Sequence, residues 1–497
     1  MYRARPFLKL APALCLCAPL AAWRNITTAD NDARPSYTRE EVSENDGSEG
    51  KPFWVIYKQS VYDLTTFRSS HPGGSFIDQA GGTDVEVFWR ARWPQHFESS
   101  RMKKVLDETR VGAVLEVEDE EEVADEDEDD EEAEYDEPVR DMSNFRTFST
   151  MPLDSETRPS VLLDSFITDQ TALYIRNHSP VPLSVCEEDV ASYPITIANT
   201  LTTLSDISLS HPLVSLTCVL QCAGNRQEDD FEASGPNFFT GTVFQDTSES
   251  GQVGNVTWEG HSLCDILRSR YPLECGEEER AEDSVYHVVF TGADEFESST
   301  PLSTLLSRGD AILATRMNGS PLSRDHGHPV RAVLPGHVGC RNVKWLESIK
   351  LSKSPSSLPW NQRYYKDADG QHIQMLPSLQ SIIFSASASS AGKLTVCGVA
   401  YTNGDASVSH VDVTTDGGKT WSAANVLRDD KEAGAPAKYS WSRWTATVDA
   451  PRPPKGEGQV TVHSRATDSA GGVQPEKSES QNGYVYNGWG KATATRG

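Results

Sequence analysis

The stretch Leu213-Val-Ser-Leu-Thr-Cys-Val-Leu-Gln-Cys-Ala-Gly-Asn-Arg226 places Cys222 just beyond an apolar run that ends at Leu220. The run predicts a β-strand, and the Gly-Asn pair after the cysteine predicts a tight turn. A cysteine at a strand end beside Arg226 is placed for a lowered thiol pKa. A nucleophilic cysteine would need a histidine base, which spacing alone cannot supply, whereas a soft thiolate is equally suited to a transition metal.

Two histidines nearer the N-terminus form a second pattern. Strand-like runs at Val55–Tyr57 and Val61–Leu64 precede the motif His71-Pro-Gly-Gly74, and His96 follows an apolar stretch. Two imidazoles on opposite walls of an apolar cleft suit axial ligation of a haem iron that only transfers electrons. A histidine met alone is more often a turn cap or a solvated loop residue, and spacing leaves that alternative open.

Residues 53–115 as a whole resemble the cytochrome b5 family. The resemblance runs from Val61-Tyr-Asp-Leu-Thr-Thr-Phe67 through the His-Pro-Gly-Gly motif to Arg110-Val-Gly-Ala-Val114. It implies a small α+β domain that binds a b-type haem, with His71 and His96 as the two ligands of the iron. With both axial positions filled, no substrate can bind that iron.

Four later motifs together resemble the sulfite oxidase family, over about residues 160–490. They are Arg176-Asn-His-Ser-Pro-Val-Pro182, Leu220-Gln-Cys-Ala-Gly-Asn-Arg226, Met317-Asn-Gly-Ser-Pro-Leu-Ser-Arg-Asp-His-Gly-His-Pro-Val-Arg331 and Val343-Lys-Trp-Leu346. The family binds a molybdopterin cofactor, in which two dithiolene sulfurs and one protein thiolate hold molybdenum. The resemblance makes Cys222 that thiolate.

The resemblance also implies which residues surround the cofactor and the substrate. Those around the pterin and its phosphate are Tyr174, Ile175, Arg176, Asn177, His178, Asp294, His326, Arg331, Asn342, Val343 and Lys344. Arg, His and Lys suit a doubly anionic phosphate, although surface salt bridges stay open for Arg331 and Lys344. Tyr365, in Trp360-Asn-Gln-Arg-Tyr-Tyr365, matches the family's catalytic tyrosine, and Arg176 would face the substrate anion.

Several pocket positions depart from the family pattern. They are Gln227, Ser234, Phe238 and Asn482. Gln227 stands where the family has a second arginine, and the acidic run Glu228–Asp230 follows it. Most of the cationic ring that would bind a divalent oxyanion is then missing, and each lost charge-assisted hydrogen bond costs about 1.5–3 kcal/mol. The cofactor residues are kept, while sulfite as the substrate is less secure.

The charge of the chain is concentrated in one segment. The 497 residues carry 45 Lys and Arg against 73 Asp and Glu, a formal net charge of −28. Between Glu116 and Glu137, 17 of 22 residues are acidic and none is basic, which predicts a flexible linker that could also attract a basic electron acceptor. Nucleic acid is disfavoured as a partner, because phosphate contacts need clustered Lys and Arg.

The N-terminal segment predicts a targeting leader. Residues 1–29 contain no Asp or Glu, and an apolar run from Phe7 to Trp23 is interrupted by two prolines. The acid-free start is typical of a mitochondrial presequence, and the apolar run is typical of a secretory signal. A two-part presequence ending in the mitochondrial intermembrane space would combine both, and the secretory pathway is the alternative. The run is too short for a membrane span of ~20 residues, so no stable insertion is expected.

The last part of the chain alternates as β-strands do. Val411–Trp421 predicts a strand, an Asp-Gly turn and a strand, and Tyr439–Trp444 and Val460–Arg465 predict further strands. This spacing indicates an immunoglobulin-like sandwich, which the family resemblance assigns to homodimerisation.

The predicted fold class is therefore α+β with several domains. The parts are a targeting leader (1–29), a disordered segment (30–50), a cytochrome b5-like domain (51–115), an acidic linker (116–140), a molybdopterin-binding domain (150–375) and an immunoglobulin-like dimerisation domain (376–490).

The resemblance implies an oxidoreductase that converts sulfite to sulfate at molybdenum and passes electrons singly through the haem to cytochrome c. One alternative is a haem- and molybdopterin-binding electron-transfer protein with a diverged substrate. Nitrate reductase is a weaker alternative, because its haem domain follows the dimerisation domain and a flavin domain comes after that, whereas here the haem motif comes first.

Overall fold

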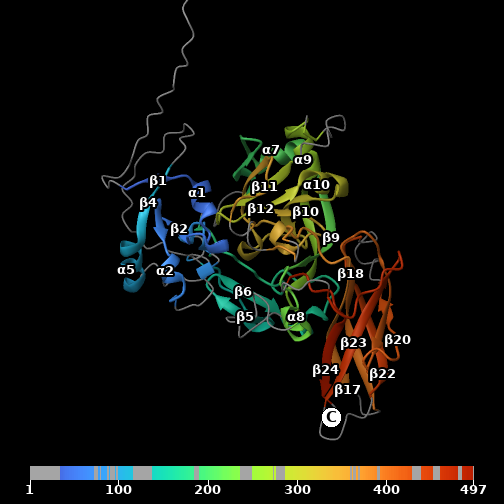
Figure 1. The fold of residues 1–497 in the computed structure, drawn as a ribbon. Helices are drawn as coiled ribbons and strands as arrows, with labels where there is room; N and C mark the ends of the chain where they lie inside the picture. The colour runs from blue at the N-terminus through green and yellow to red at the C-terminus, as the bar shows by residue number, and fades with distance from the viewer. Residues whose placement is uncertain are drawn as a thin grey trace, which may run out of the picture.

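The computed structural model describes residues 34–71, 77–78, 80–86, 89, 96, 99–115, 137–183, 190–234, 249–272, 274–275, 286–358, 361, 365–367, 370–388, 392–427, 438–450, 459–478 and 484–495. Along the chain follow a small α+β domain, a larger mixed α/β domain and a β sandwich, coloured blue, green to yellow, and orange to red (Figure 1). The predicted multidomain α+β class is confirmed. The leader and most of the acidic run lie outside the described residues.

The N-terminal domain is built on a four-stranded sheet in the order β1-β4-β3-β2. Its elements are β1 (Ser36–Tyr37), α1 (Arg39–Glu44), β2 (Trp54–Tyr57), β3 (Ser60–Asp63), α2 (Thr65–Arg68), α5 (Ser100–Thr109) and β4 (Arg110–Val114). The strands predicted around Val55 and Val61 are confirmed as β2 and β3, and their apolar side chains are buried.

The prediction of disorder over residues 30–50 is wrong for residues 34–50. Strand β1 pairs in parallel with β4, and α1 begins with a capping box between Thr38 and Glu41. Val42, although surrounded by polar neighbours in sequence, is fully buried against β2, β3 and β4. One apolar side chain and one cap therefore order a segment whose composition alone predicts a solvated chain.

The central domain contains two five-stranded sheets, in the orders β14-β13-β10-β9, with β15 beside β13, and β12-β11-β16-β7-β8. The strands are β7 (Pro194–Ile197), β8 (Thr200–Thr203), β9 (Leu213–Gln221), β10 (Val253–Ser262), β11 (His287–Gly292), β12 (Glu297–Pro301), β13 (Ile312–Met317), β14 (Ser320–Pro321), β15 (Arg331–Val333) and β16 (Leu346–Ser352). The hairpin of β5 (Phe145–Thr150) and β6 (Leu153–Thr157) precedes them, and the helices are α6 (Pro159–Leu162), α7 (Leu204–Ser210), α8 (Gln227–Ser234), α9 (Leu263–Arg270) and α10 (Leu302–Arg308).

The strand that leads to Cys222 is present as predicted, whereas the short apolar run Leu173–Ile175 does not form a strand. Here Leu173 donates its backbone N–H to the carbonyl of Asp169, which closes a turn. The segment then makes a single antiparallel bridge, between Asp154 and Arg176. The apolar run is buried because it lies under the cavity described below and not because it belongs to a sheet.

The C-terminal domain is a sandwich of two four-stranded sheets, ordered β17-β18-β22-β21 and β20-β19-β23-β24. Its strands are β17 (Leu379–Ala388), β18 (Lys393–Thr402), β19 (Val408–Thr414), β20 (Ser422–Ala423), β21 (Asn425–Leu427), β22 (Ser442–Asp449), β23 (Gln459–Asp468) and β24 (Gly490–Thr495). Val396 and Trp444 of one sheet share a buried core with Val411 and Val462 of the other. The predicted sandwich is confirmed, and β24 extends it to Thr495.

Among the described residues, no helix combines the length and the apolar character that a membrane crossing requires.

The capping box of α1 gives a first prediction. Replacing Thr38 by Ala removes the side chain that accepts from the Glu41 backbone N–H at 3.1 Å, and should destabilise α1 by about 1 kcal/mol. Hydrogen exchange at the α1 amides should accelerate accordingly. Ser43→Ala is the matched control, because the Ser43 hydroxyl bonds only the Glu40 carbonyl within the helix and its loss leaves the cap intact. Equal exchange in Thr38→Ala and the wild type would contradict the capping role.

Candidate active site

One cavity of the central domain gathers side chains that lie far apart in sequence. It encloses about 630 Å³ including its open mouth, and it is lined by Tyr174, Arg176, His178, Leu220, Cys222, Asp294, Phe296, Asp325, His326, Arg331, Gly339, Cys340, Asn342, Val343, Lys344 and Tyr365. Every residue that the sequence assigns to the molybdenum cofactor or to catalysis is in this set, except Ile175 and Asn177.

The two exceptions lie directly behind the wall. Ile175 packs with Phe145 and Leu153, so it supports the lining and does not face the cavity. The side-chain oxygen of Asn177 accepts a hydrogen bond from the Lys344 ammonium. Asn177 therefore positions a lining residue.

Cys222 follows the last residue of β9 and is held there by the main chain. Its backbone N–H donates to the Gln252 carbonyl at 3.0 Å. Gly339 lies against it so closely that a Cβ at Gly339 would come within 3.4 Å of the Cys222 Cα and 3.0 Å of the Tyr174 hydroxyl. A side chain there would press on the Tyr174 hydroxyl and on the Gln221 carbonyl, also 3.0 Å away, whereas its distance to the Cys222 Cα is ordinary contact.

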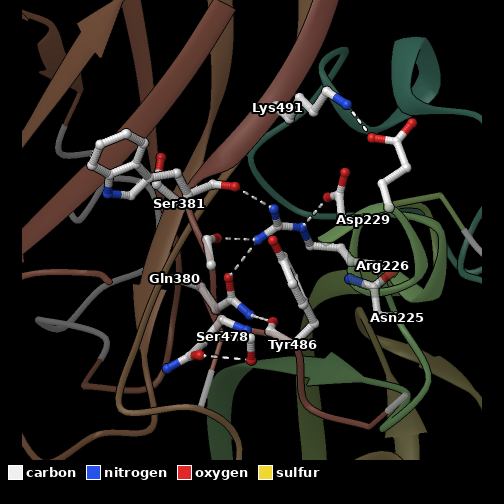
Figure 2. A network of polar contacts seen from close by, with 12 residues as sticks. Asn225, Arg226, Asp229, Gln380, Ser381, Ser478, Tyr486 and Lys491 are labelled. Atoms are coloured by element: carbon white, nitrogen blue, oxygen red, sulfur yellow. Dashed lines mark hydrogen bonds and ion pairs between the residues drawn. The ribbon is translucent and has the colours of Figure 1, made fainter. Parts of the chain in front are cut away.

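The lowered thiol pKa predicted for Cys222 is wrong. Burial raises its pKa to about 12, and the positive charge of Arg176 opposes that shift only in part. Arg226, the sequence neighbour on which the prediction was based, points toward the C-terminal domain instead (Figure 2). Adjacency to an arginine in sequence therefore does not place the charge of that arginine beside the thiol.

Three basic residues, Arg331, His326 and Lys344, form what we call the floor of the cavity; the first two are buried and Lys344 is half-buried. Arg331 is 3% exposed, donates to the carbonyls of His326 at 3.0 Å and Asn342 at 2.9 Å, and lies 4.9 Å over the ring of Trp258. Burial lowers its pKa to about 10 and that of His326 to about 3, and it also lowers the pKa of Lys344 well below its usual range. Cationic groups resist burial unless an anion compensates them.

This floor fits an anionic ligand. Among the described residues, the Arg331 Nε and the Asn177 Nδ2 are buried and have no hydrogen-bond partner. A pterin phosphate presents the anionic oxygens that such donors bind. The donor set, together with a thiol at the end of β9, suits the molybdopterin cofactor.

Asp325 brings an unforeseen partner to the cavity wall. Its carboxylate accepts two hydrogen bonds from Arg140, at 2.8 and 2.6 Å, and both side chains are 13% exposed or less. Arg140 also pairs with Glu137, whose other oxygen accepts from the Val181 N–H at 2.8 Å. The predicted linker 116–140 therefore ends earlier than expected, because residues 137–140 are attached to the central domain.

Above the floor lie the groups suited to substrate and proton handling. The Tyr365 hydroxyl and the His178 Nε2 are 2.8 Å apart, and the His178 ring stacks on Phe296 at 4.2 Å. Arg176 is held by Asp154 at 3.1 Å. Tyr365 has a positive φ of 55°, so its backbone adopts a left-handed conformation that residues other than glycine rarely take. Such a strained backbone is typical of functional sites, where it directs a side chain toward a ligand at a cost in local stability.

Of the positions that depart from the family pattern, two are described. Gln227 begins α8 and Ser234 ends it, whereas Phe238 and Asn482 lie outside the described residues. Among lining residues, sequence reasoning did not anticipate Leu220, Phe296, Asp325, Gly339 and Cys340. Asp325 lies within the Met317–Arg331 motif next to His326, and Cys340 lies two residues before Asn342, and this proximity was the signal available for them.

The two histidines of the N-terminal domain face each other. Their ring centres are 6.4 Å apart, with planes inclined by 30°. If both rings bound one metal ion, two metal–nitrogen bonds of about 2 Å, plus roughly 1 Å from each nitrogen to its ring centre, would separate the ring centres by about 6 Å. Phe67 packs against His71 and Trp89 stacks on His96, which makes the surroundings apolar. The pair fits an iron with two axial imidazoles, while residues 72–74 of the motif lie outside the described part.

Comparison with known families defines the class of protein. Residues 38–115 match the cytochrome b5-like haem/steroid binding domain, residues 178–360 the oxidoreductase molybdopterin binding domain, and residues 366–495 the Mo-co oxidoreductase dimerisation domain. The chain is thus an oxidoreductase with a molybdenum cofactor and a b-type haem.

Comparison with individual proteins narrows the class. Mitochondrial sulfite oxidase of Drosophila melanogaster is 32% identical over 90% of this chain and 78% of its own length, and sulfite oxidase of Gallus gallus is 32% identical over 89% and 95%. The chain therefore belongs to the sulfite oxidase family. The structure of the sulfane dehydrogenase SoxCD from Paracoccus pantotrophus shares the fold, with a TM-score of 0.53 and 23% identity over 69% of this chain and 85% of that one.

The Arg140–Asp325 pair gives a second prediction. Removing one partner of a buried ion pair costs about 3–5 kcal/mol, so Arg140→Met should destabilise the central domain by an amount of that order. The isolated Asp325 charge should also repel the anionic cofactor and reduce the molybdenum bound per chain, leaving haem content unchanged. Urea unfolding and metal analysis would measure both effects.

Two further variants test whether this effect comes from the uncompensated charge. Adding Asp325→Asn to Arg140→Met should recover much of the lost stability. Arg316→Met removes a more exposed ion pair, with Glu259 at 3.1 Å, and should change little. If the double variant were as unstable as the sum of its parts, the charge argument would be wrong.

Proposed function

We propose that this protein oxidises sulfite to sulfate at a molybdenum centre and sends the electrons singly through its haem domain. The observation that carries the proposal is the convergence of Cys222, Arg176 and the Tyr365–His178 pair on one cavity with a buried cationic floor. Overall, sulfite gains one oxygen that derives from water and releases two electrons and two protons.

Cys222 is the protein thiolate of the molybdenum, and Arg331, Lys344 and His326 hold the anionic end of the pterin. These three residues and Cys222 line the same cavity, where Arg331 and His326 are buried and Lys344 is half-buried. When bound, the cofactor supplies the two-electron redox chemistry and the oxygen transfer. The thiol proton leaves on binding, because a coordinating thiol is deprotonated.

Arg176 binds the substrate oxyanion. Its ion pair with Asp154 at 3.1 Å fixes the guanidinium direction and leaves part of its charge for the ligand. The Tyr365 hydroxyl lies at hydrogen-bond distance from His178, so a proton released at the substrate side has a route from the phenol to the imidazole. Phe296 stacks on that imidazole and restricts its rotation.

His71 and His96 ligate the haem iron, and a small redox protein such as cytochrome c is the electron acceptor. The support is the facing pair of rings at 6.4 Å. The mitochondrial relatives and the acid-free leader favour a mitochondrial protein, and we place it in the intermembrane space. The match to a dimerisation domain family favours a homodimer.

A second candidate is oxidation of another reduced sulfur oxyanion. Gln227 stands where the family has an arginine, and the helix that it begins has three acidic residues in its first turn. Arg176 would then bind the substrate without the second arginine of the family. A less highly charged anion needs fewer charge-assisted hydrogen bonds than sulfite and would lose less binding free energy from that replacement.

Mixing the holoprotein with sulfite without oxygen tests the proposal. Protein that contains both metals should show prompt conversion of the haem spectrum from oxidised to reduced. Full molybdenum and haem loading with no haem reduction by sulfite would contradict it, and reduction by a different sulfur oxyanion alone would favour the second candidate.

Cys222→Ser gives the third prediction. The variant should keep its haem, because the haem site lies in another domain, but sulfite should no longer reduce that haem. Chemical reduction by dithionite in both proteins is the control for an intact haem. A variant that still oxidised sulfite at the wild-type rate would refute the thiolate assignment.

A further inference from the structure

The turn that follows Cys222 is fastened to the C-terminal domain by Arg226. The Arg226 side chain is 1% exposed and lies across the domain boundary (Figure 2). Its Nη1 donates to the Gln380 Oε1 at 3.0 Å and to the Gly488 carbonyl at 2.9 Å, and its Nη2 donates to the Trp489 carbonyl at 2.7 Å. All three acceptors belong to the C-terminal domain.

The remaining contacts of Arg226 complete its burial. Its Nε donates to Asp229 at 2.7 Å, and the Tyr486 ring lies 4.7 Å from the guanidinium carbon. The side-chain amide of Gln380 also donates to the Tyr486 carbonyl. A guanidinium presents its donors in a fixed planar fork, so this set of acceptors determines where the Arg226 backbone must lie.

The same turn is tied to the C-terminal domain a second time, closer to the cysteine. The Val485 N–H donates to the Ala223 carbonyl at 2.7 Å. Arg226 itself has a positive φ of 67°, a conformation that costs a non-glycine residue free energy and persists only where other contacts impose it. Contacts made by residues 485–489 therefore fix the turn both immediately after Cys222 and four residues later.

Residues 484–489 also reach the other side of the cavity. The Tyr484 ring is 5.2 Å from the ring of Tyr365, which lines the cavity and meets His178. One short segment of the C-terminal domain thus contacts both the turn that carries the thiol and the tyrosine that handles protons.

We propose that Arg226 is a positioning residue of the molybdenum centre, acting through an interdomain clasp of Arg226 and Asp229 with Gln380, Tyr486, Gly488 and Trp489. The inference rests on the proposed role of Cys222 as the metal ligand. The clasp sets the direction of the Cys222 thiolate, so the dimerisation domain is a structural part of the active site as well as a contact surface. Arginine is needed because lysine cannot satisfy three separate acceptors in a planar arrangement.

The test compares two interdomain arginines in the full-length holoprotein. Arg226→Lys keeps the charge but loses the fork. Arg308→Lys is the matched control. Arg308 also crosses the boundary between the two domains, where it donates to the Asn403 carbonyl at 2.9 Å and to Asp405 at 2.8 Å. Arg308 is not among the residues that line the cavity.

The readout is the electron paramagnetic resonance spectrum of molybdenum(V) after partial chemical reduction, with metal content measured alongside. Arg226→Lys should shift the g-values and slow haem reduction by ~10–100-fold, because a small displacement of a reacting group has effects of that size. Arg308→Lys should give the wild-type spectrum. A wild-type spectrum in Arg226→Lys, or the same shift in both variants, would overturn the proposal.

A second pair of variants covers the case in which Arg226→Lys does not fold. Tyr486→Leu removes the ring beside the guanidinium and should shift the spectrum in the same direction, whereas Tyr486→Phe keeps the ring and should not. Identical spectra from this pair would also overturn the clasp. Failure of the proposed function can be told apart from failure of the clasp. If the proposed function is wrong, sulfite will not reduce the haem even in the wild-type protein.

Discussion

Buried guanidinium groups that bind backbone carbonyls are the constraint on which the active site depends. The cavity is walled by irregular segments, whose carbonyls have no neighbouring strand to satisfy them. Arg331 binds the carbonyls of His326 and Asn342, Arg341 makes two bonds to the Ile373 carbonyl at 2.9 and 2.8 Å, and Arg226 binds those of Gly488 and Trp489. Arg331 joins carbonyls 5 and 11 residues away, Arg341 one 32 residues away and Arg226 one 262 residues away, so each arginine fixes irregular backbone that no neighbouring strand holds.

The same arginines explain why the central and C-terminal domains act together. Arg226 and Arg308 cross the boundary between them, and the hydroxyls of Tyr439 and Tyr401 cross it to Asp310 and Gln221. Two of these residues contact β9 itself: the Tyr439 carbonyl accepts from the Val219 N–H, and Gln221 is the last residue of the strand. The reaction needs a metal centre of fixed geometry and a haem that accepts its electrons singly. The cavity lies in the central domain, which the C-terminal domain holds in place, and the haem belongs to the N-terminal domain.

The sequence predicted those features that depend on local motifs. Cys222, the pair His71 and His96, and the residues around Arg331 could be singled out because each lies in a short run with its own chemistry or a family resemblance, and the structure brings each group together. The errors came from long-range contacts. Residues 34–50 are ordered by Val42, which packs against strands up to 72 residues later at Val114. Arg226 was read as a neighbour of the thiol, yet its partners lie about 260 residues away, and Arg140 meets Asp325 across 185 residues. No local pattern encodes such pairs.

The basic groups of the floor link their own protonation to the binding of an anion. Burial lowers the pKa values of Arg331, Lys344 and His326, so holding these groups protonated in the folded chain has an electrostatic cost. An anionic pterin phosphate would favour the protonated forms and remove that cost. Binding to the folded chain alone stabilises it by about 2.7 kcal/mol at a hundredfold excess over the dissociation constant. An anion bound at this floor would therefore stabilise the central domain, to which these three residues belong.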